Sequence, residues 1–423
     1  MQVHIEPAAV KGVLSAPPSK SLAHRALLCA ALANGSSTVS RLEYSEDIEA
    51  TLRAAQQMGA RVLREGGTVT MAAHAGFATF IRPVDCGESG STLRFLIPML
   101  SLSGQKIRFT GRGRLMQRPM QVYAEVLPAH GTRFTQDENG ITVFGAPLAG
   151  EYKLPGDVSS QFISGLLLAL PLLDSSSTLR IQPPFESRSY VELTRAMQAK
   201  FGVHSQWRGE NTLFIPGAQA YQPCRYAVEG DYSQAAFLAV LGAAAGDVTV
   251  TGLAERTAQG DAVILDILRR CGAAPYRTTA NDGWRFLRAA LTATDIDLAD
   301  CPDLGPILMV LGALCTGTTV IRNAGRLRLK ESDRIAAMQE ELAKFGIVLQ
   351  AEGDTVTVAG GTLHAPAVPL SSHNDHRIAM SLAVLALAAG VSADIEGAEA
   401  VAKSWPGYWD ALALLGAEVQ KNA

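Results

Sequence analysis

The sequence predicts an α/β protein of two domains, each made of three repeated α/β units. A polar turn that opens an Ala- and Leu-rich helix recurs near positions 19, 87, 156, 230, 301 and 374, at intervals of 68 to 74 residues. A second helical segment in each unit ends at a glycine, and these glycines recur at intervals of 70 to 74 residues. Helical and strand-like segments alternate throughout, as expected of a repeated α/β architecture.

The polar turns open the first helix of each unit. They lie at 19–21, 87–94, 156–161, 230–234, 301–305 and 374–377. Serines and aspartates in these turns are most simply explained as helix caps. They therefore carry little functional information by themselves.

The second helix of each unit closes at Gly59, Gly131, Gly202, Gly272, Gly346 and Gly416. A strand-like run follows each glycine, and five of these runs reach a turn, at 65–67, 138–140, 208–210, 281–283 and 352–354. Each turn separates two predicted strands. The sixth unit stops after a strand at 418–420, so we expect the N-terminal strand at 2–6 to supply the missing partner.

A chain of 423 residues should divide into domains, most simply of three units each. The fourth unit begins near Val228. We therefore expect a first domain at 15–226 and a second at 1–14 and 227–423, with the chain crossing between them twice. A single six-unit solenoid is the alternative, but it would leave the N-terminal strand without its proposed partner.

Composition limits the classes of partner. The chain is 48% hydrophobic and 18% charged, with a formal net charge of −3 and 6% aromatic residues. A nucleic-acid surface would need excess positive charge and stacking rings, and no apolar run is long enough to span a membrane. The six cysteines lack CxxC spacing, which indicates reduced thiols, and no metal-ligand motif occurs. We expect a cytoplasmic monomer without metal or cofactor.

Cations stand where a helix should begin. The stretch 326–334 reads Arg-Leu-Arg-Leu-Lys-Glu-Ser-Asp-Arg, and apolar residues then follow at helical spacing. Ser332 or Asp333 can cap this helix. Cations at a helix N-terminus oppose the helix dipole, so an anionic ligand would explain them. A solvated face balanced by acidic neighbours is the simpler alternative.

The same pattern extends to other helix starts, where capping cannot explain a cation. The residues are Lys20, Arg25, Arg94, Arg118, Lys330, Arg334, Arg377 and Lys403. Helix N-termini favour anions, and arginine can clamp a carboxylate or phosphate. We therefore predict small, multiply anionic ligands, bound where helix N-termini of the two domains face an interdomain cleft. We expect these ligands to draw the domains together.

Five motifs carry a resemblance to a known family. They are Pro-Ser-Lys-Ser at 18–21 with Arg25, Gly-Asp-Val-Ser-Ser-Gln-Phe at 156–162, Lys-Glu-Ser-Asp-Arg-Ile at 330–335, Asp-His-Arg at 375–377 and Lys-Ser at 403–404. In this order and over nearly the whole chain, the sequence resembles the 5-enolpyruvylshikimate-3-phosphate synthases. That family has two domains of three repeated units, similar to the organisation predicted from the period.

The resemblance implies transfer of the enolpyruvyl group of phosphoenolpyruvate to the 5-hydroxyl of shikimate 3-phosphate. By matched position, shikimate 3-phosphate would be held by Lys20, Ser21, Arg25, Ser159, Ser160, Gln161, Ser187, Asp303 and Lys330. Phosphoenolpyruvate would be held by Lys20, Gly90, Arg118, Gln161, Arg334, Arg377 and Lys403.

The same resemblance implies acid and base roles. Addition needs a base near the attacking hydroxyl and an acid that protonates the methylene carbon; elimination then removes a proton from that carbon. Asp303 would orient and deprotonate the hydroxyl, Glu331 would exchange the proton with carbon, and Lys330 would serve the substrate or a proton relay. Lys20 is a further candidate, and the division of roles among these residues stays open.

The glycine loop and three other signals are less clear. Glu88-Ser89 precedes Gly90, where the commoner family pattern has Asn-Ala. His376 could be an acid or base or a packed histidine, and His373 reads as a surface residue. Cys86 is interpreted as a buried strand cysteine rather than a catalytic one.

Two alternatives are considered, a second enolpyruvyl transferase and a relative of another class. A UDP-N-acetylglucosamine enolpyruvyl transferase would share the fold, but should show Lys-Asn where this chain has Lys20-Ser21, and a reactive loop cysteine. A non-enzymatic anion-binding or RNA-end-processing relative is the second alternative. Phosphate release assayed with each acceptor separates them.

Overall fold

The computed structural model describes residues 1–279 and 283–422, which form two compact units. One unit contains residues 20–228; the other contains residues 1–19 and the chain from 229 onward. The division lies a few residues beyond the positions expected from the sequence. The reason is pairing with distant segments: the Ala16 amide donates to the carbonyl of Thr251, and the Ser19 amide donates to the carbonyl of Glu229, which ties residues 15–19 to the unit that contains residues 229 onward.

The unit of residues 20–228 has six α-helices and three four-stranded sheets in its described part. The helices are α1 (Lys20–Leu32), α2 (Glu46–Gln57), α3 (Gly90–Ser101), α4 (Gln121–Val126), α5 (Ser160–Ala169) and α6 (Arg188–Lys200). The strands are β3 (Gly35–Ser40), β4 (Arg61–Glu65), β5 (Thr68–Ala73), β6 (Val84–Asp85), β7 (Ile107–Thr110), β8 (Arg133–Asp137), β9 (Gly140–Phe144), β10 (Glu151–Pro155), β11 (Ser177–Gln182), β12 (Gln206–Trp207), β13 (Thr212–Ile215) and β14 (Arg225–Ala227). The sheet orders are β14-β3-β5-β4, β6-β7-β9-β8 and β10-β11-β13-β12.

The other unit repeats this plan over its described residues. Its helices are α7 (Tyr232–Ala245), α8 (Ile264–Arg270), α9 (Gly305–Leu314), α10 (Arg334–Lys344), α11 (His376–Ala389) and α12 (Tyr408–Leu414). Its strands are β1 (Gln2–Glu6), β2 (Lys11–Ser15), β15 (Asp247–Thr251), β16 (Tyr276–Thr278), β17 (Gly283–Leu287), β18 (Asp295–Asp297), β19 (Thr318–Arg322), β20 (Leu349–Glu352), β21 (Thr355–Ala359), β22 (Leu370–Ser371), β23 (Ala393–Glu396) and β24 (Glu418–Asn422). The sheet orders are β16-β17-β15-β2, β18-β19-β21-β20 and β22-β23-β1-β24.

Short 3-10 helices connect several of these elements. They are η1 (Leu115–Gln117), η2 (Pro128–His130), η3 (Leu170–Leu172), η4 (Gly260–Val263), η5 (Pro302–Leu304), η6 (Gly325–Leu329) and η7 (Ala398–Lys403). Four of them, η1, η5, η6 and η7, carry or directly precede charged residues of the predicted site.

The N-terminal strand completes the sixth repeat, as predicted. In the other five sheets a hairpin follows the central strand, whereas β1 takes the hairpin position in the sixth sheet. It pairs antiparallel with β24, where Ile5 lies opposite Val419, and with β23, where Val3 lies opposite Ile395. Ile5 and Val3 are fully buried, so the chain start is part of this unit's core. Four of the predicted hairpin turns lie between paired strands, and the turn at 281–283 lies mostly outside the described residues.

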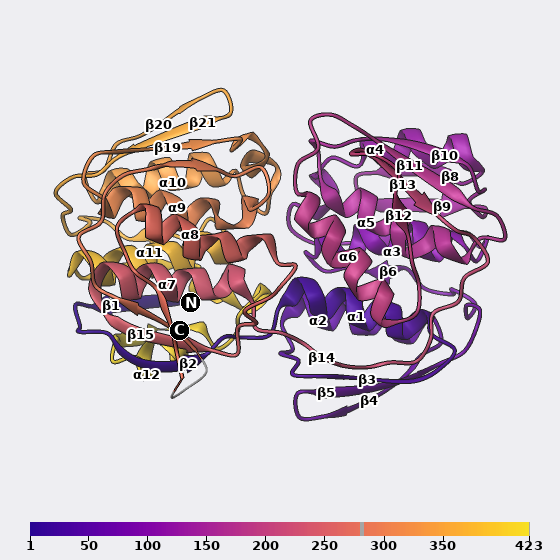
Figure 1. Cartoon of the computed structure of the whole chain (residues 1–423), viewed down its shortest axis with the longest axis horizontal. Coiled ribbons are helices and arrows are strands. Elements are labelled where there is room, and N and C mark those ends of the chain that lie inside the picture. Colours follow the sequence, from indigo (N-terminus) through magenta and orange to yellow (C-terminus); the bar gives the residue numbers. More distant parts are fainter. Residues whose placement is uncertain (280–282, 423) are drawn as a thin grey trace. The chain divides into compact units, whose positions relative to one another are not determined.

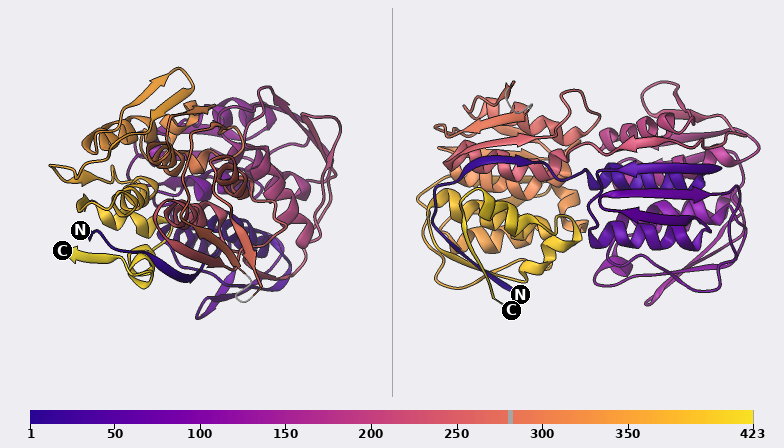
Figure 2. Two further views of the ribbon diagram at one scale, coloured as in Figure 1. Left: turned by 60° about the vertical axis from the view of Figure 1, so that its left-hand side comes forward. Right: turned by 90° about the horizontal axis from the view of Figure 1, so that it is seen from below.

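The first helix of each repeat forms the core. All residues of α9 from Gly305 to Ala313 are buried, because this helix is apolar on every side. It packs with α7 and α11 in one unit, and α3 packs on α5 in the other (Figure 1). In the unit of residues 20–228, the sheet that contains β3 and β5 also covers α1 from the outside (Figure 2).

The six predicted glycines close the second helices. Their φ angles lie between 77° and 108°, in the left-handed region that glycine adopts without a steric penalty. At the start of α10, Asp333 is the cap: its carboxylate accepts from the amides of Ile335 and Ala336. Among the described residues, no helix is both long and apolar enough to cross a membrane.

Candidate functional site

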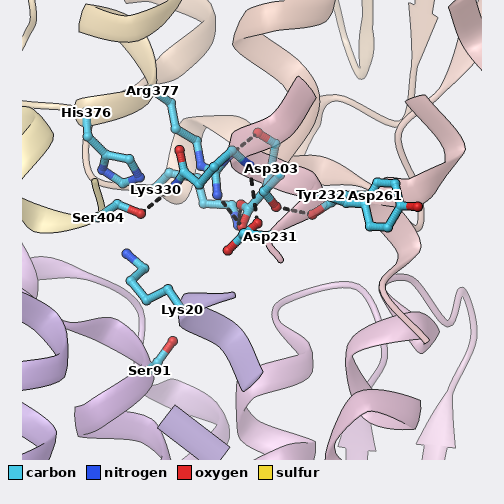
Figure 3. Close-up of polar contacts among 12 residues, drawn as sticks. Lys20, Ser91, Asp231, Tyr232, Asp261, Asp303, Lys330, His376, Arg377 and Ser404 are labelled. Atoms are coloured by element: carbon cyan, nitrogen blue, oxygen red, sulfur yellow. Dashed lines mark hydrogen bonds and ion pairs between the residues drawn. The ribbon is translucent and has the colours of Figure 1, made fainter. Parts of the chain in front are cut away.

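Three helix starts bring an ionic cluster together in the unit that contains α7 to α12. Asp303 comes from η5, which leads into α9; Lys330 and Glu331 come just before α10, and Arg377 from the first turn of α11. Figure 3 shows Asp303, Lys330 and Arg377 gathered from these separate elements. Arg334 opens α10 and joins the same cluster.

Asp303 is the centre of this cluster. Its carboxylate lies 3.2 Å from Lys330 Nζ, 3.0 Å from Arg377 Nη2 and 3.5 Å from Arg334 Nη1. Arg377 also donates to the Asp303 carbonyl at 2.8 Å. Burial acts to raise the pKa of Asp303, but Arg377, Lys330 and Arg334 outweigh it and hold that pKa well below its usual range. Asp303 is therefore an anion at neutral pH.

Arg334 and Asp375 form a buried ion pair. The side chain of Arg334 is 1% exposed and that of Asp375 is fully buried, and Arg334 Nε donates to Asp375 Oδ2 at 2.8 Å. Ser332 donates to the same oxygen at 3.0 Å. Burial acts to lower the pKa of Arg334, but Asp375, Glu331 and Asp303 raise it above its ordinary value. The guanidinium is thus charged and fixed in orientation.

Glu331 and Lys330 flank this pair. Glu331 accepts from Arg334 Nη2 at 2.7 Å. Burial lowers the pKa of Lys330 below its usual value, although Asp303 opposes the shift. A lysine with a lowered pKa gives up its proton more readily, which suits a group that relays protons.

Lys403, at the end of η7, is held by the segment before α11. Its Nζ donates to the carbonyl of Asn374 at 2.7 Å. Ser404, the next residue, accepts from Gln234 Nε2 of α7 at 2.6 Å. The position of Lys403 is therefore fixed by α7 and by the segment before α11. Nothing in the sequence indicated Gln234 beyond its place in a polar turn.

A second cluster lies at the start of α3 in the unit of residues 20–228. A Cβ added to Gly90 would lie 2.7 Å from Arg118 Nη1 and 3.1 Å from Arg94 Nη1, so a side chain at this position would displace the guanidinium of Arg118 and crowd that of Arg94. Arg94 donates to Gln161 Oε1 at 2.7 Å, and Gln161 donates to Ser91 at 2.9 Å. Two buried cations beside the N-terminus of α3 make this an anion-favouring position.

The segment around α5 adds further polar groups to this unit. Ser159 caps α5 by accepting from the amide of Gln161, and Ser160 is the first residue of the helix. Ser187 precedes α6 and lies in the left-handed region, with a φ of 53°. A serine in that conformation is uncommon, and such positions concentrate at functional sites.

Lys20, Ser21 and Arg25 lie together on the first turns of α1, but with different surroundings. Lys20 Nζ lies 2.9 Å from Asp47 of α2. Arg25 is buried, and its guanidinium donates to the Ser21 carbonyl at 2.7 Å and to Thr194 of α6 at 2.8 Å. Burial lowers the pKa of Arg25 to about 10, so it stays charged at neutral pH. In this structure Arg25 joins α1 to α6, and its predicted contact with phosphate stays a prediction.

Three uncertain signals are decided by burial. Cys86 is fully buried next to β6, as interpreted from the sequence, and burial raises the pKa of its thiol. His376 is 2% exposed at the start of α11, which supports the packed alternative. The expectation that His373 is a surface residue is wrong: the ring is half-buried, because it bonds to the buried Glu341. Asp47 and Asp375 were not assigned roles from the sequence, since both read as acidic residues in a first helix turn.

Comparison with known proteins agrees with these features. The family model for EPSP synthase (3-phosphoshikimate 1-carboxyvinyltransferase) matches residues 5–412. The chain belongs to the EPSP synthase family. Family membership confirms the resemblance inferred from the five motifs.

Relatives named 3-phosphoshikimate 1-carboxyvinyltransferase include proteins from two clostridia. The Clostridium kluyveri protein is 38% identical over 422 residues, covering 99% of this chain and 98% of the relative. The Clostridium acetobutylicum protein is 38% identical over 425 residues, with the same coverage. The match therefore extends over whole chains and not only over the motifs.

Solved structures of the family have the same fold. An EPSP synthase structure from Acinetobacter baumannii matches with a TM-score of 0.82 at 28% identity, covering 99% of this chain and 100% of that one. The enolpyruvyl transferase NikO from Streptomyces tendae matches with a TM-score of 0.80 at 18% identity, covering 99% and 98% of the two chains, which shows a shared fold alone. The predicted two-domain α/β class is thereby confirmed.

Proposed function

We propose that this chain transfers the enolpyruvyl group of phosphoenolpyruvate to the 5-hydroxyl of shikimate 3-phosphate and releases phosphate. The full-length family match carries this proposal, because relatives across the whole chain bear the name of that activity. The ionic clusters support it: both substrates are anions, and cations are fixed at helix starts in each unit.

The substrate contacts are proposed residue by residue. Shikimate 3-phosphate is assigned to Lys20, Ser21, Arg25, Ser159, Ser160, Gln161 and Ser187 in the unit of residues 20–228, with Asp303 and Lys330 from the other unit. Phosphoenolpyruvate is assigned to Lys20, Gly90, Arg118, Gln161, Arg334, Arg377 and Lys403. Arginine pairs held in place by carboxylates are suited to this task, since a bidentate guanidinium fixes the direction of a carboxylate or phosphate.

The proposed reaction begins with addition. The 5-hydroxyl oxygen bonds to C2 of phosphoenolpyruvate, and its proton passes to the Asp303 carboxylate. Glu331 gives a proton to C3, which becomes a methyl group, so a tetrahedral ketal forms. Asp303 is a weak base because three cations lower its pKa, so we assign it chiefly to orienting the hydroxyl and to accepting the proton as the new bond forms.

Elimination completes the transfer. The bond from C2 to the phosphate oxygen breaks, and phosphate leaves with the bonding electrons and takes up the proton that Asp303 received. Glu331 takes a proton back from the methyl carbon, and the C2–C3 double bond is restored. Lys330 lies 3.2 Å from Asp303 and carries a lowered pKa, so we assign it to the proton relay and to the departing charge.

Phosphate release by purified protein tests the function. We expect release with shikimate 3-phosphate and phosphoenolpyruvate and none when UDP-N-acetylglucosamine replaces the acceptor. Glu331→Gln should leave substrate binding largely intact and lower turnover by about 10²- to 10⁴-fold, the usual contribution of a general acid or base. Unchanged turnover would remove Glu331 from this role, and release only with the other acceptor would favour the alternative transferase.

We also propose that the protein works as a cytoplasmic monomer. Its formal charge of −3 gives it no general attraction to nucleic acid or to an anionic membrane surface. Analytical ultracentrifugation tests the oligomeric state, and a sedimentation coefficient typical of a dimer at micromolar concentration would contradict it.

A further inference from the structure

The segment from Ser371 to Asp375 connects β22 to α11 in an unusual conformation. His373 and Asn374 both lie in the left-handed region, with φ angles of 50° and 54°. Two successive residues with side chains rarely adopt this conformation, and surrounding contacts must hold them there. The segment carries two groups of the site: the Asn374 carbonyl accepts from Lys403, and Asp375 pairs with Arg334.

Glu341 of α10 supplies the contacts at the other end of the segment. Its side chain is fully buried. One carboxylate oxygen lies 3.0 Å from His373 Nε2, and the other accepts from the Ser371 amide at 3.0 Å. Lys344 Nζ lies 2.9 Å from both oxygens and also donates to the carbonyl of Pro369. A buried carboxylate thus holds three groups on and around the segment.

The spacing along α10 explains why one helix can fix both ends. Arg334 and Glu341 are seven residues apart, which places them on the same helix face, two turns apart. Arg334 holds Asp375 at one end, and Glu341 holds Ser371 and His373 at the other. Of the two left-handed residues, His373 is itself bonded to Glu341, and Asn374 lies between His373 and Asp375.

The charges around this contact favour a carboxylate. Burial acts to raise the pKa of Glu341, but hydrogen bonds from His373 and Lys344 outweigh it and lower that pKa. The hydrogen bond to Glu341 raises the pKa of His373. Glu340 lies 3.9 Å from the same ring. These three side chains could also hold a metal ion, but the Lys344 ammonium already bonds to both oxygens of Glu341.

We propose that Glu341 is a positioning residue, which acts through the Ser371 to Asp375 segment to place Lys403 and Arg334 for the anionic substrate. This inference rests on the proposed function in one respect, the assignment of Lys403 and Arg334 to phosphoenolpyruvate. Glu341 touches neither substrate in this assignment. Its effect is to keep the Asn374 carbonyl and the Asp375 carboxylate where the two cations need them.

Glu341→Gln tests the proposal, with Glu340→Gln as the matched control. The first change removes the buried charge and keeps the side-chain size, whereas Glu340 is 61% exposed and lies 3.9 Å from the His373 ring. We expect Glu341→Gln to raise the KM for phosphoenolpyruvate by about tenfold, the cost of a weakened charge-assisted hydrogen bond network. The KM for shikimate 3-phosphate should change less than twofold, and Glu340→Gln should match the wild type.

Hydrogen exchange followed by mass spectrometry gives a readout without substrate. Amides of residues 371–375 should exchange at least about tenfold faster in Glu341→Gln, because their fixed conformation opens more often. If Glu341→Gln fails to fold, His373→Asn replaces it: asparagine tolerates the left-handed conformation and is too short to keep the bond to Glu341. His373→Asn should show the same two effects to a smaller degree.

The outcomes separate this inference from the proposed function. Faster exchange together with a selective rise in the KM for phosphoenolpyruvate supports the positioning role. Unchanged exchange at 371–375 overturns it. A lower turnover with both KM values unchanged also overturns it, because that result would indicate only a smaller folded fraction. Faster exchange in a protein whose wild type releases no phosphate would contradict the proposed function and leave the structural part of the inference standing.

Discussion

The buried pair of Arg334 and Asp375 gives a prediction with a magnitude. Asp375→Asn removes the carboxylate charge but keeps the side-chain shape and the ability to cap α11. Removing one partner of a buried ion pair costs about 3–5 kcal/mol. Arg334 keeps Glu331 at 2.7 Å and Asp303 at 3.5 Å as partners. We therefore expect the loss in free energy of unfolding to fall below that range, at about 2–3 kcal/mol.

Urea unfolding followed by tryptophan fluorescence measures this loss. Three of the four tryptophans, Trp284, Trp405 and Trp409, lie in the same unit as the pair. The control is Asp333→Asn, which changes the cap of α10 at a side chain that is 35% exposed. Asparagine also caps helices, so this variant should lose less than about 0.5 kcal/mol. Equal stabilities of the two variants would refute the reasoning.

The difference in free energy of unfolding between wild type and Asp375→Asn should also depend on pH, which provides a second check. Burial acts to raise the pKa of Asp375, but Arg334 outweighs it and the pKa is lowered. A carboxylate with a lowered pKa stabilises the fold above its unfolded pKa of about 3.9 and loses that contribution as the pH falls through its folded value. The stability difference between wild type and Asp375→Asn should therefore be constant from about pH 5 to 7 and shrink below about pH 4. A difference that grows on acidification would contradict this assignment.

Three further predictions concern the unit of residues 20–228. Gly90→Ala should raise the KM for phosphoenolpyruvate by at least about tenfold in the phosphate-release assay. The reason is that the new Cβ would lie 2.7 Å from Arg118 Nη1 and 3.1 Å from Arg94 Nη1. An unchanged KM would show that both side chains move aside without effect. A thiol reagent should label Cys224 first in the native protein, since it is the one cysteine of six that is not buried, and peptide mapping that finds another site first would contradict the burial. Arg25→Lys should lower the thermal midpoint by several degrees, because lysine cannot serve the separate oxygens that the guanidinium now bonds; a midpoint within one degree of wild type would refute it.

The repeat was predictable because it depends on residues whose conformational preferences are local. Glycines that close helices need only a left-handed backbone, so their positions, such as Gly59 and Gly346, show in the sequence wherever a helix must end. The pairing of β1 with β24 was also predictable, since the sixth repeat lacked one strand and one strand had no other place. The domain boundaries were less exact, because hydrogen bonds of residues 16–19 to Thr251 and Glu229 are contacts between distant segments.

The residue types of the candidate site were predictable, but their partners were not. Cations at helix starts stood out because capping does not explain them. Which acid each would meet depends on how separate helices pack: Arg334 meets Asp375 across 41 residues, and Arg377 meets Asp303 across 74. His373 was misjudged for the same reason, because Glu341 lies on another helix and nothing near His373 in sequence indicates it. The expected meeting of cationic groups from both domains at a common cleft stays a prediction.

The sequence by itself determined the repeated α/β units, the strand that completes the sixth of them, the family and the anionic nature of the ligands. These features depend on the spacing and type of residues, because helices, strands and turns each require particular residues at particular intervals along the chain. Only the tertiary structure decided the protonation and orientation of the charged groups. Burial and distance set those properties, and both arise from segments that are far apart in the chain and are packed together by the hydrophobic core.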